Sequence, residues 1–214
     1  MADSLLRVER LQKRFGGLVA TDRLDFAVER GELHALIGPN GAGKTTLIHQ
    51  LSGALKPDRG SIVFDGQDVT TRSLHERVRT GLARSYQITS LFKRFSVRHN
   101  LALAVLARSG SSLRFWQPLS REAALAREAV ALAARVGLAG REHRTAGTLS
   151  HGEQRQLEVG LALATNARLL LLDEPMAGMG PEESQRMIEL IASLKGTVTV
   201  LLVAAPLCAN TSAP

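Results

Sequence analysis

The chain has 214 residues, of which 44% are hydrophobic and 22% are charged. These values are close to the globular average, so they exclude a disordered chain and a membrane-type composition and predict a soluble protein of one domain or two joined lobes. Lysine and arginine number 27 against 20 for aspartate and glutamate. The basic residues are scattered, which is typical of a solvated surface, so the charge gives only weak support for a polyanionic partner.

Cysteine content and apolar runs bear on the compartment. The single cysteine, Cys208, excludes an intramolecular disulfide framework and suits a reducing environment. The first residues lack the features of a secretory signal, and no apolar run approaches the roughly 18 residues of a membrane span. We therefore expect a cytosolic protein that associates with a membrane only through a partner.

The hydrophobic pattern alternates between strand and helix signals. Short apolar runs in residues 5–37 and 60–64 predict strands, and a helix is predicted at 44–53. Residues 97–140 are rich in alanine, leucine and arginine and predict a mostly helical insert. Beyond the insert we expect a helix at 151–164, a strand at 169–172, a helix at 181–194 and a strand at 197–203. This alternation predicts an α/β core with a largely parallel sheet.

A phosphate-binding loop is the strongest motif. Residues 38–46 read GPNGAGKTT, which matches the pattern G-x-x-x-x-G-K-[ST] between a predicted strand and a predicted helix. Its glycines let successive backbone N–H groups point at phosphate oxygens, Lys44 would reach the β- and γ-phosphates, and the Thr45 hydroxyl would bind Mg²⁺. The residues assigned to nucleotide binding here are Gly38, Asn40, Gly41, Gly43, Lys44, Thr45 and Thr46.

A pair of carboxylates follows the apolar run at 169–172. Asp173 and Glu174 come at the carboxyl end of a buried strand, where open α/β sheets bind their ligands. Asp173 would contribute to the Mg²⁺ site, and Glu174 would act as general base on the attacking water. One acidic residue at a strand end is common in any fold, but two of them together with a phosphate loop favour nucleotide hydrolysis.

Between these motifs, residues 149–156 read LSHGEQRQ, which by propensity is a helix start capped by Ser150. The order of phosphate loop, Leu-Ser-x-Gly-x-Gln segment and Asp-Glu-Pro resembles the nucleotide-binding subunit of ATP-binding cassette (ABC) transporters, from about residue 5 to residue 203. The resemblance implies one ABC ATPase domain over residues 1–203: a P-loop NTPase core with a mostly parallel sheet, an N-terminal antiparallel β portion and a helical subdomain at about 97–160. Residues 204–214 would form an irregular tail.

The resemblance also implies a mechanism and partners. In that family two cassettes form a head-to-tail dimer around two ATP molecules, so Ser150 and Gly152 would face the γ-phosphate held by the other subunit. Gln87 would touch Mg²⁺ and the attacking water, and Phe15 would stack on adenine. Without the other motifs, a single Gln and a single Phe would have ordinary surface or core roles. The implied partners are a second copy or a second ABC subunit and transmembrane permease subunits, at the inner face of the cell membrane.

Several segments point to a subfamily. The sequences RFGGLVA at 14–20, YQIT at 86–89 and DEPMAGM at 173–179 resemble the cassettes of branched-chain amino acid and urea-type importers. The cassette does not touch the transported solute, so this assignment rests wholly on resemblance.

The chain departs from the family after residue 203. Members carry a histidine beyond the last core strand that contacts the γ-phosphate, and Ala205 stands at the expected place. An alanine side chain forms no hydrogen bond. The C-terminal part is therefore expected to be truncated or altered. We expect ATP binding to persist and turnover to fall by ~10² to 10³, the usual effect of losing one positioned catalytic contact.

Three hypotheses remain open at this point. The chain is an ATP-hydrolysing transporter subunit, a hydrolysis-impaired ATP-binding module, or a non-transport ABC protein acting on DNA or ribosomes. About a hundred residues without sustained heptads separate Lys44 from Ser150, whereas DNA-repair cassettes carry a long coiled coil there. We therefore expect no nucleic-acid partner.

Overall fold

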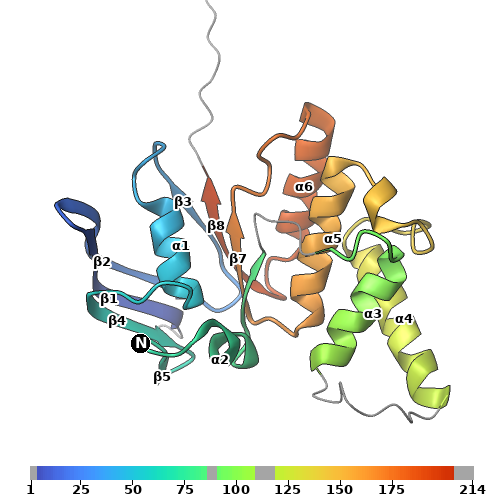
Figure 1. Cartoon of the computed structure of the whole chain (residues 1–214), viewed down its shortest axis with the longest axis horizontal. Helices are drawn as coiled ribbons and strands as arrows, with labels where there is room; N and C mark the ends of the chain where they lie inside the picture. Colours follow the sequence, from blue (N-terminus) through green and yellow to red (C-terminus); the bar gives the residue numbers. More distant parts are fainter. Residues whose placement is uncertain (1–3, 86–90, 109–118, 205–214) are drawn as a thin grey trace, which may run out of the picture.

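A computed structural model describes residues 4–85, 91–108 and 119–204. The described strands form two four-stranded sheets, one parallel and one antiparallel. Figure 1 shows the parallel sheet in the middle of the molecule, with the antiparallel sheet on one side and most of the helices on the other.

The parallel sheet has the strand order β3-β8-β7-β6. Its strands are β3 (Leu33–Ile37), β8 (Thr199–Ala204), β7 (Leu169–Asp173) and β6 (Leu82–Ser85). All five residues of β7 are buried. A strand covered on both faces needs an unbroken apolar run, which the four leucines of β7 provide.

The antiparallel sheet is built from the N-terminal part of the chain, in the order β2-β1-β4-β5. Its strands are β1 (Ser4–Phe15), β2 (Leu18–Glu29), β4 (Arg59–Phe64) and β5 (Gln67–Asp68). β1 and β2 form a hairpin whose turn places Gly16 at a φ of 58°, a conformation that glycine adopts without steric cost.

Helix α1 (Lys44–Ser52) connects the two sheets. Its apolar residues pack in one cluster with the antiparallel sheet and with Leu169 and Leu171 of β7. The alternate residues of β7, Leu170 and Leu172, pack in a second cluster on the other face. This alternation places α1 and the helical part of the chain on opposite faces of the parallel sheet.

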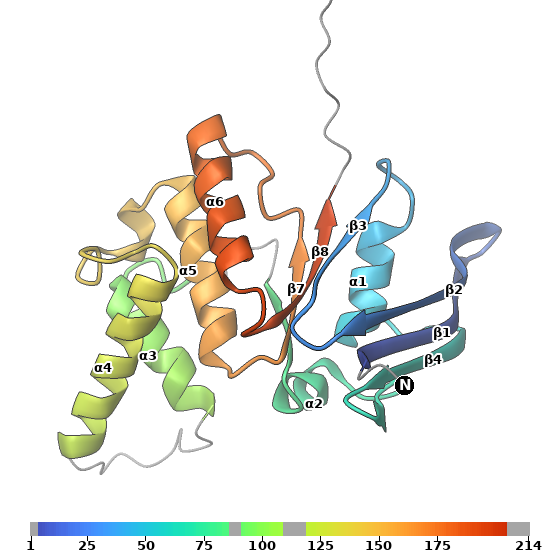
Figure 2. The ribbon, with the colours of Figure 1, turned by 180° about the vertical axis from the view of Figure 1, so that it is seen from behind.

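The remaining helices are α2 (Leu74–Arg79), α3 (Val97–Arg108), α4 (Leu119–Arg135), α5 (His151–Ala164) and α6 (Pro181–Ser193). Figure 2 shows α3 and α4 side by side at the end of the molecule away from the antiparallel sheet, with α5 and α6 between them and β7. In the described ranges, no helix has both the length and the apolarity needed to cross a membrane.

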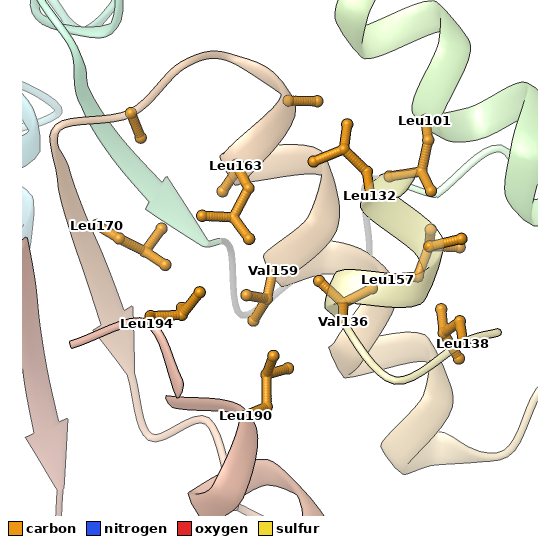
Figure 3. Close-up of a cluster of buried hydrophobic side chains, with 14 of the residues drawn as sticks. Leu101, Leu132, Val136, Leu138, Leu157, Val159, Leu163, Leu170, Leu190 and Leu194 are labelled. Carbon is orange, nitrogen blue, oxygen red and sulfur yellow. The ribbon is translucent and has the colours of Figure 1, made fainter. Parts of the chain in front are cut away.

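Helix α5 is the centre of the larger core. Figure 3 shows its residues Leu157, Val159 and Leu163 among side chains from α3, α4, α6 and β7. At Gly160 an added Cβ would lie 3.0 Å from Cδ2 of Leu101 in α3, so glycine lets these two helices pack closely without moving that side chain. One continuous core therefore joins the helices to the parallel sheet.

The predicted fold class is confirmed: a mixed α/β fold with a parallel sheet, an N-terminal antiparallel sheet and a group of helices. The helix predicted at 151–164 has the same bounds as α5, and the predicted strand and helix after it match β7 and α6 within a residue or two. The sequence analysis did not predict α2 and β6, which have six and four residues.

Candidate functional site

The carboxyl ends of the parallel strands meet at one edge of the sheet. Ile37 pairs with Ala204, and Asp173 pairs with Val203, so β3, β8 and β7 end level with one another. The phosphate loop begins directly after Ile37, and Glu174 follows Asp173. The fold therefore brings the two strongest sequence motifs to the same edge, where α/β sheets bind ligands.

The phosphate loop, residues 38–43, curves around the side chain of Lys44. The Lys44 Nζ donates to the carbonyl oxygens of Gly38 at 2.6 Å and Pro39 at 2.8 Å. Gly41 and Gly43 have φ angles of 84° and 81°, in the left-handed region that favours glycine. The loop thus wraps the ammonium group that would share its concave side with a phosphate.

The start of α1 suits an anion. The cap residue Gly43 offers no side-chain hydrogen bond, and the first turn holds no acidic residue. A helix N-terminus of this kind carries free N–H groups and positive potential. Thr45 is exposed at this end and Thr46 is partly buried beside it, while Asn40 is exposed in the loop.

Close contact with the hairpin fixes the end of the loop. A Cβ built on Gly43 would lie 2.0 Å from the carbonyl oxygen of Ala20 in β2. The buried Thr21 hydroxyl donates to Gln50 Oε1 at 2.9 Å and ties β2 to α1 as well. The hairpin that carries Phe15 is therefore held against the phosphate loop.

Phe15 ends β1 with 49% of its surface exposed. The Lys13 ammonium lies 5.6 Å from the centre of its ring, and Lys13 also pairs with Asp58 at 2.8 Å. An exposed, supported aromatic face is the kind of surface on which a flat heterocycle stacks. Gln87, the other residue assigned from the resemblance, lies outside the described residues, as does Ala205.

Asp173 is buried beside an arginine. Its Oδ2 accepts a hydrogen bond from an Arg84 guanidinium nitrogen at 3.1 Å, and the two side chains are only 3% and 7% exposed. The nearby His49 of α1 has a lowered pKa, first because of burial and then because of the Arg84 charge, with Asp173 acting in the opposite direction. Elements α1, β6 and β7 thus bring titratable groups together at the sheet edge.

Glu174 adopts a strained backbone conformation. Its φ is 47°, and its N–H donates to the carbonyl oxygen of Val203 at 2.8 Å. A non-glycine residue in this region costs energy and is frequent at functional sites. The chain turns sharply here, directly after the buried Asp173, and leaves the Glu174 side chain partly exposed.

The donor set at this edge fits Mg²⁺. It consists of the Thr45 hydroxyl and the Asp173 carboxylate, both oxygen donors. The described part of the chain holds no group of three or more His, Cys, Asp and Glu side chains that could form an all-protein metal site. Mg²⁺ usually keeps several waters and takes one or two protein oxygens together with the phosphates of a substrate.

Ser150 caps α5 in a complete capping box. Its Oγ accepts from the Glu153 N–H at 3.2 Å, and its own N–H donates to Glu153 Oε2 at 3.0 Å. Gly152 lies buried in the first turn. The motif between the phosphate loop and the carboxylates therefore forms a helix start, as its residue types predict.

The start of α5 is separated from the phosphate loop. In Figures 1 and 2 the loop after β3, the ends of β7 and β8 and the starts of α5 and α6 all lie on the same side of the molecule. Strands β8 and β7 and helix α6 stand between the loop and the start of α5. The phosphate loop and the start of α5 thus lie on the same side of the molecule without being neighbours.

Two residues near these motifs were missed by sequence reasoning. Arg84 contacts Asp173 across 89 residues of sequence, and Glu183 contacts Ser150 across 33. Neither carries a motif of its own. A charged residue at the end of the short strand β6 and an acidic residue in the first turn of α6 were the only signals available.

Comparison with known proteins gives matches over most of the chain. Residues 21–177 match the family described as ABC transporter. The high-affinity branched-chain amino acid transport ATP-binding protein BraF of Pseudomonas aeruginosa is 38% identical over 212 residues, which is 95% of this chain and 82% of the relative. LivG of Escherichia coli, which has the same description, is 37% identical over 211 residues, again 95% and 82% of the two chains.

Solved structures of ATP-binding cassettes are similar to this chain over most of its length. MJ1267, an ATP-binding cassette of an ABC transporter, superposes with a TM-score of 0.81 at 31% identity, covering 94% of this chain and 81% of that one. The ADP conformation of the same cassette gives a TM-score of 0.79 at 30% identity, covering 94% and 80%. Together with the phosphate loop and the carboxylates at one sheet edge, these matches show that the chain belongs to the ABC transporter family, as an ATP-binding subunit with relatives in branched-chain amino acid transport.

Proposed function

We propose that this chain binds ATP with Mg²⁺ and powers an importer of branched-chain amino acids, or of related amino acids or urea, from the inner face of the cell membrane. The observation that carries the proposal is the meeting of the phosphate loop and the Asp173–Glu174 pair at one sheet edge. The proposed class of transported solute rests on the relatives, because the residues of this site would contact the nucleotide and not the solute.

Each residue has a chemical task in this proposal. The N–H groups of the loop and of the α1 start bind phosphate oxygens, and Lys44 moves from its two carbonyl partners to the β- and γ-phosphates. Thr45 and Asp173 would hold Mg²⁺, which neutralises phosphate charge when bound. Glu174 would accept a proton from the attacking water, and the resemblance assigns Gln87 to the same water. Phe15 stacks on the adenine.

Two subunits complete each site. Because the start of α5 lies apart from the phosphate loop of the same chain, Ser150 and Gly152 at that start would meet the γ-phosphate of an ATP held by a second subunit. A symmetric head-to-tail dimer of this chain satisfies both halves at once. A second ABC subunit with the same motifs could take the place of the second copy.

The remaining surfaces are assigned from the family. The domain would span residues 1–203, with a helical lobe at about 97–160 that contacts transmembrane permease subunits. This lobe contains α3, α4 and most of α5. Peripheral attachment to the inner membrane face then follows from the permease.

Low turnover is the second part of the proposal. Position 205 follows Ala204 in the sequence, and Ala204 pairs with Ile37, the residue before the phosphate loop. An alanine there supplies no hydrogen bond to the γ-phosphate. We expect ATP to bind normally. The rate of hydrolysis should be about 10² to 10³ times lower than with a histidine at this position.

Binding and hydrolysis of ATP by the purified chain with Mg²⁺ test both parts. Binding of a fluorescent ATP analogue should be lost in Lys44→Ala, and the residual turnover should rise more than linearly with protein concentration. Ala205→His should raise turnover by about 10². Binding that survives Lys44→Ala would refute the site, and an Ala205→His variant without any gain would show that position 205 does not limit hydrolysis.

A further inference from the structure

The carboxylate of Glu183 occupies the start of α5. Its Oε1 accepts hydrogen bonds from the Ser150 hydroxyl at 2.8 Å and from the Gly152 N–H at 3.2 Å. Glu183 belongs to the first turn of α6, so this contact joins two helices that begin on the same side of the molecule. The two donors are the ones assigned above to the γ-phosphate of a second subunit's ATP.

The Ser150 hydroxyl has a single proton. It accepts from the Glu153 N–H and donates to Glu183, so both of its directional roles are in use. A phosphate oxygen approaching Ser150 must therefore take the place of the carboxylate oxygen. Two anions cannot share this donor set, because their charges repel at hydrogen-bond distance.

Close packing strengthens the contact. A Cβ built on Gly152 would lie 2.8 Å from Glu183 Cδ, so a glycine is needed for the carboxylate to reach the α5 backbone. The pKa of Glu183 lies below its ordinary value, chiefly because Ser150 donates to it. The N-terminus of α5 favours the negative charge as well.

We propose that Glu183 is an internal substitute for the γ-phosphate, which keeps the start of α5 closed in the single subunit and withdraws when the ATP of a second subunit arrives. The inference rests on the proposed function and adds a ligand that competes with the γ-phosphate for the Leu-Ser-x-Gly-x-Gln segment at the start of α5. Glu183 is partly exposed, so its side chain can turn into solvent.

The contact also links the catalytic edge to α5. Residues 174–180 are the chain segment that joins Asp173 to α6, the helix that carries Glu183. Their path runs beside α5: a Cβ on Gly178 would lie 3.8 Å from His151 Nε2. Release of Glu183 would therefore break the hydrogen bonds between the start of α6 and the start of α5, where the segment after Asp173 and Glu174 ends.

The test compares dimer formation by the full chain, by Glu183→Ala and Glu183→Gln, and by the control Glu182→Ala. Glu182 is an exposed carboxylate in the same first turn of α6, so the control makes the same change in charge beside the same helix end. Sedimentation velocity with Mg²⁺ and increasing ATP gives the ATP concentration at half dimer. Binding of a fluorescent ATP analogue to dilute monomer is measured in parallel.

We expect Glu183→Ala to reach half dimer at a roughly threefold to tenfold lower ATP concentration than the unmodified chain, with Glu182→Ala unchanged and Glu183→Gln between them. Monomer ATP binding should be equal in all four. Equal or weaker dimerisation of Glu183→Ala would overturn the competing role and leave the proposed function intact. ATP binding without dimers in any variant would overturn the two-subunit sandwich, and this inference with it.

Discussion

At the residue scale, Gly43 is the position of the phosphate loop that tolerates a side chain least. An alanine there would place its Cβ 2.0 Å from the Ala20 carbonyl oxygen, on a backbone with a φ of 81°. Gly41 has a similar φ of 84°, but nothing lies within 4 Å of its Cβ position. The pair therefore separates the cost of backbone conformation from the cost of a steric clash.

We expect Gly43→Ala to lower the free energy of unfolding by about 3 kcal/mol and Gly41→Ala by about 1 kcal/mol, because only the first adds overpacking to the left-handed strain. Urea denaturation of the two variants measures the difference. Equal losses of unfolding free energy would show that the β1–β2 hairpin can move away from the phosphate loop at no cost. The contact between Gly43 and Ala20 would then not determine the shape of the loop.

Some residues of the candidate site could be predicted from the sequence and others could not. Lys44, Thr45 and Asp173 belong to motifs whose residue types are dictated by phosphate and Mg²⁺ chemistry, so local sequence was sufficient to propose them. Arg84 and Glu183 act through partners far away in sequence. Their roles depend on how the strands pair and how two helices converge, which no local pattern contains.

At the element scale, α1 depends on one buried arginine. Arg77 of α2 is only 1% exposed, and burial lowers its pKa to about 10. Its guanidinium donates at 2.7 to 3.1 Å to four carbonyl oxygens, those of Gln50, Leu51, Thr70 and Arg72. Two of these carbonyls belong to the last turn of α1, so Arg77 satisfies the end of the helix that carries Lys44.

Replacing Arg77 with methionine keeps the apolar stem and removes the donors. We expect the free energy of unfolding to fall by about 3 kcal/mol, because the buried carbonyls lose their partner. The exposed Arg79, two residues along the same helix, should tolerate the same replacement within about 0.5 kcal/mol. Urea denaturation of both variants measures the two losses of unfolding free energy. Similar losses would show that water hydrogen-bonds to the α1 carbonyls in place of Arg77.

Element length determined how much of the fold was predictable. Helix α5 has a capping box and a long apolar face, and β7 is a run of leucines, so both were predicted from sequence. Helix α2 and strand β6 are too short for periodicity to be visible. They form because Arg77 anchors one to α1 and because β7 pairs with the other.

At the scale of the whole molecule, the proposed two-subunit ATP site depends on how far apart two motifs of one chain lie. The phosphate loop and the start of α5 face the same side but are separated by β8, β7 and α6. The sequence order of the motifs indicated the family, but only the folded chain shows that the phosphate loop and the start of α5 lie apart. Under the proposed function, a second subunit supplies the other half of each site.

The most direct measurement tests dimer formation in a mixture of two variants, each of which lacks one half of the proposed site. Lys44→Ala lacks a working phosphate loop and keeps Ser150, whereas Ser150→Ala has the reverse defect, so a mixed head-to-tail dimer contains one intact site. By sedimentation velocity with ATP and Mg²⁺, we expect neither variant alone to dimerise and the equimolar mixture to form dimers. A mixture that stays monomeric where the unmodified chain dimerises, or a Lys44→Ala chain that dimerises alone, would contradict the shared site.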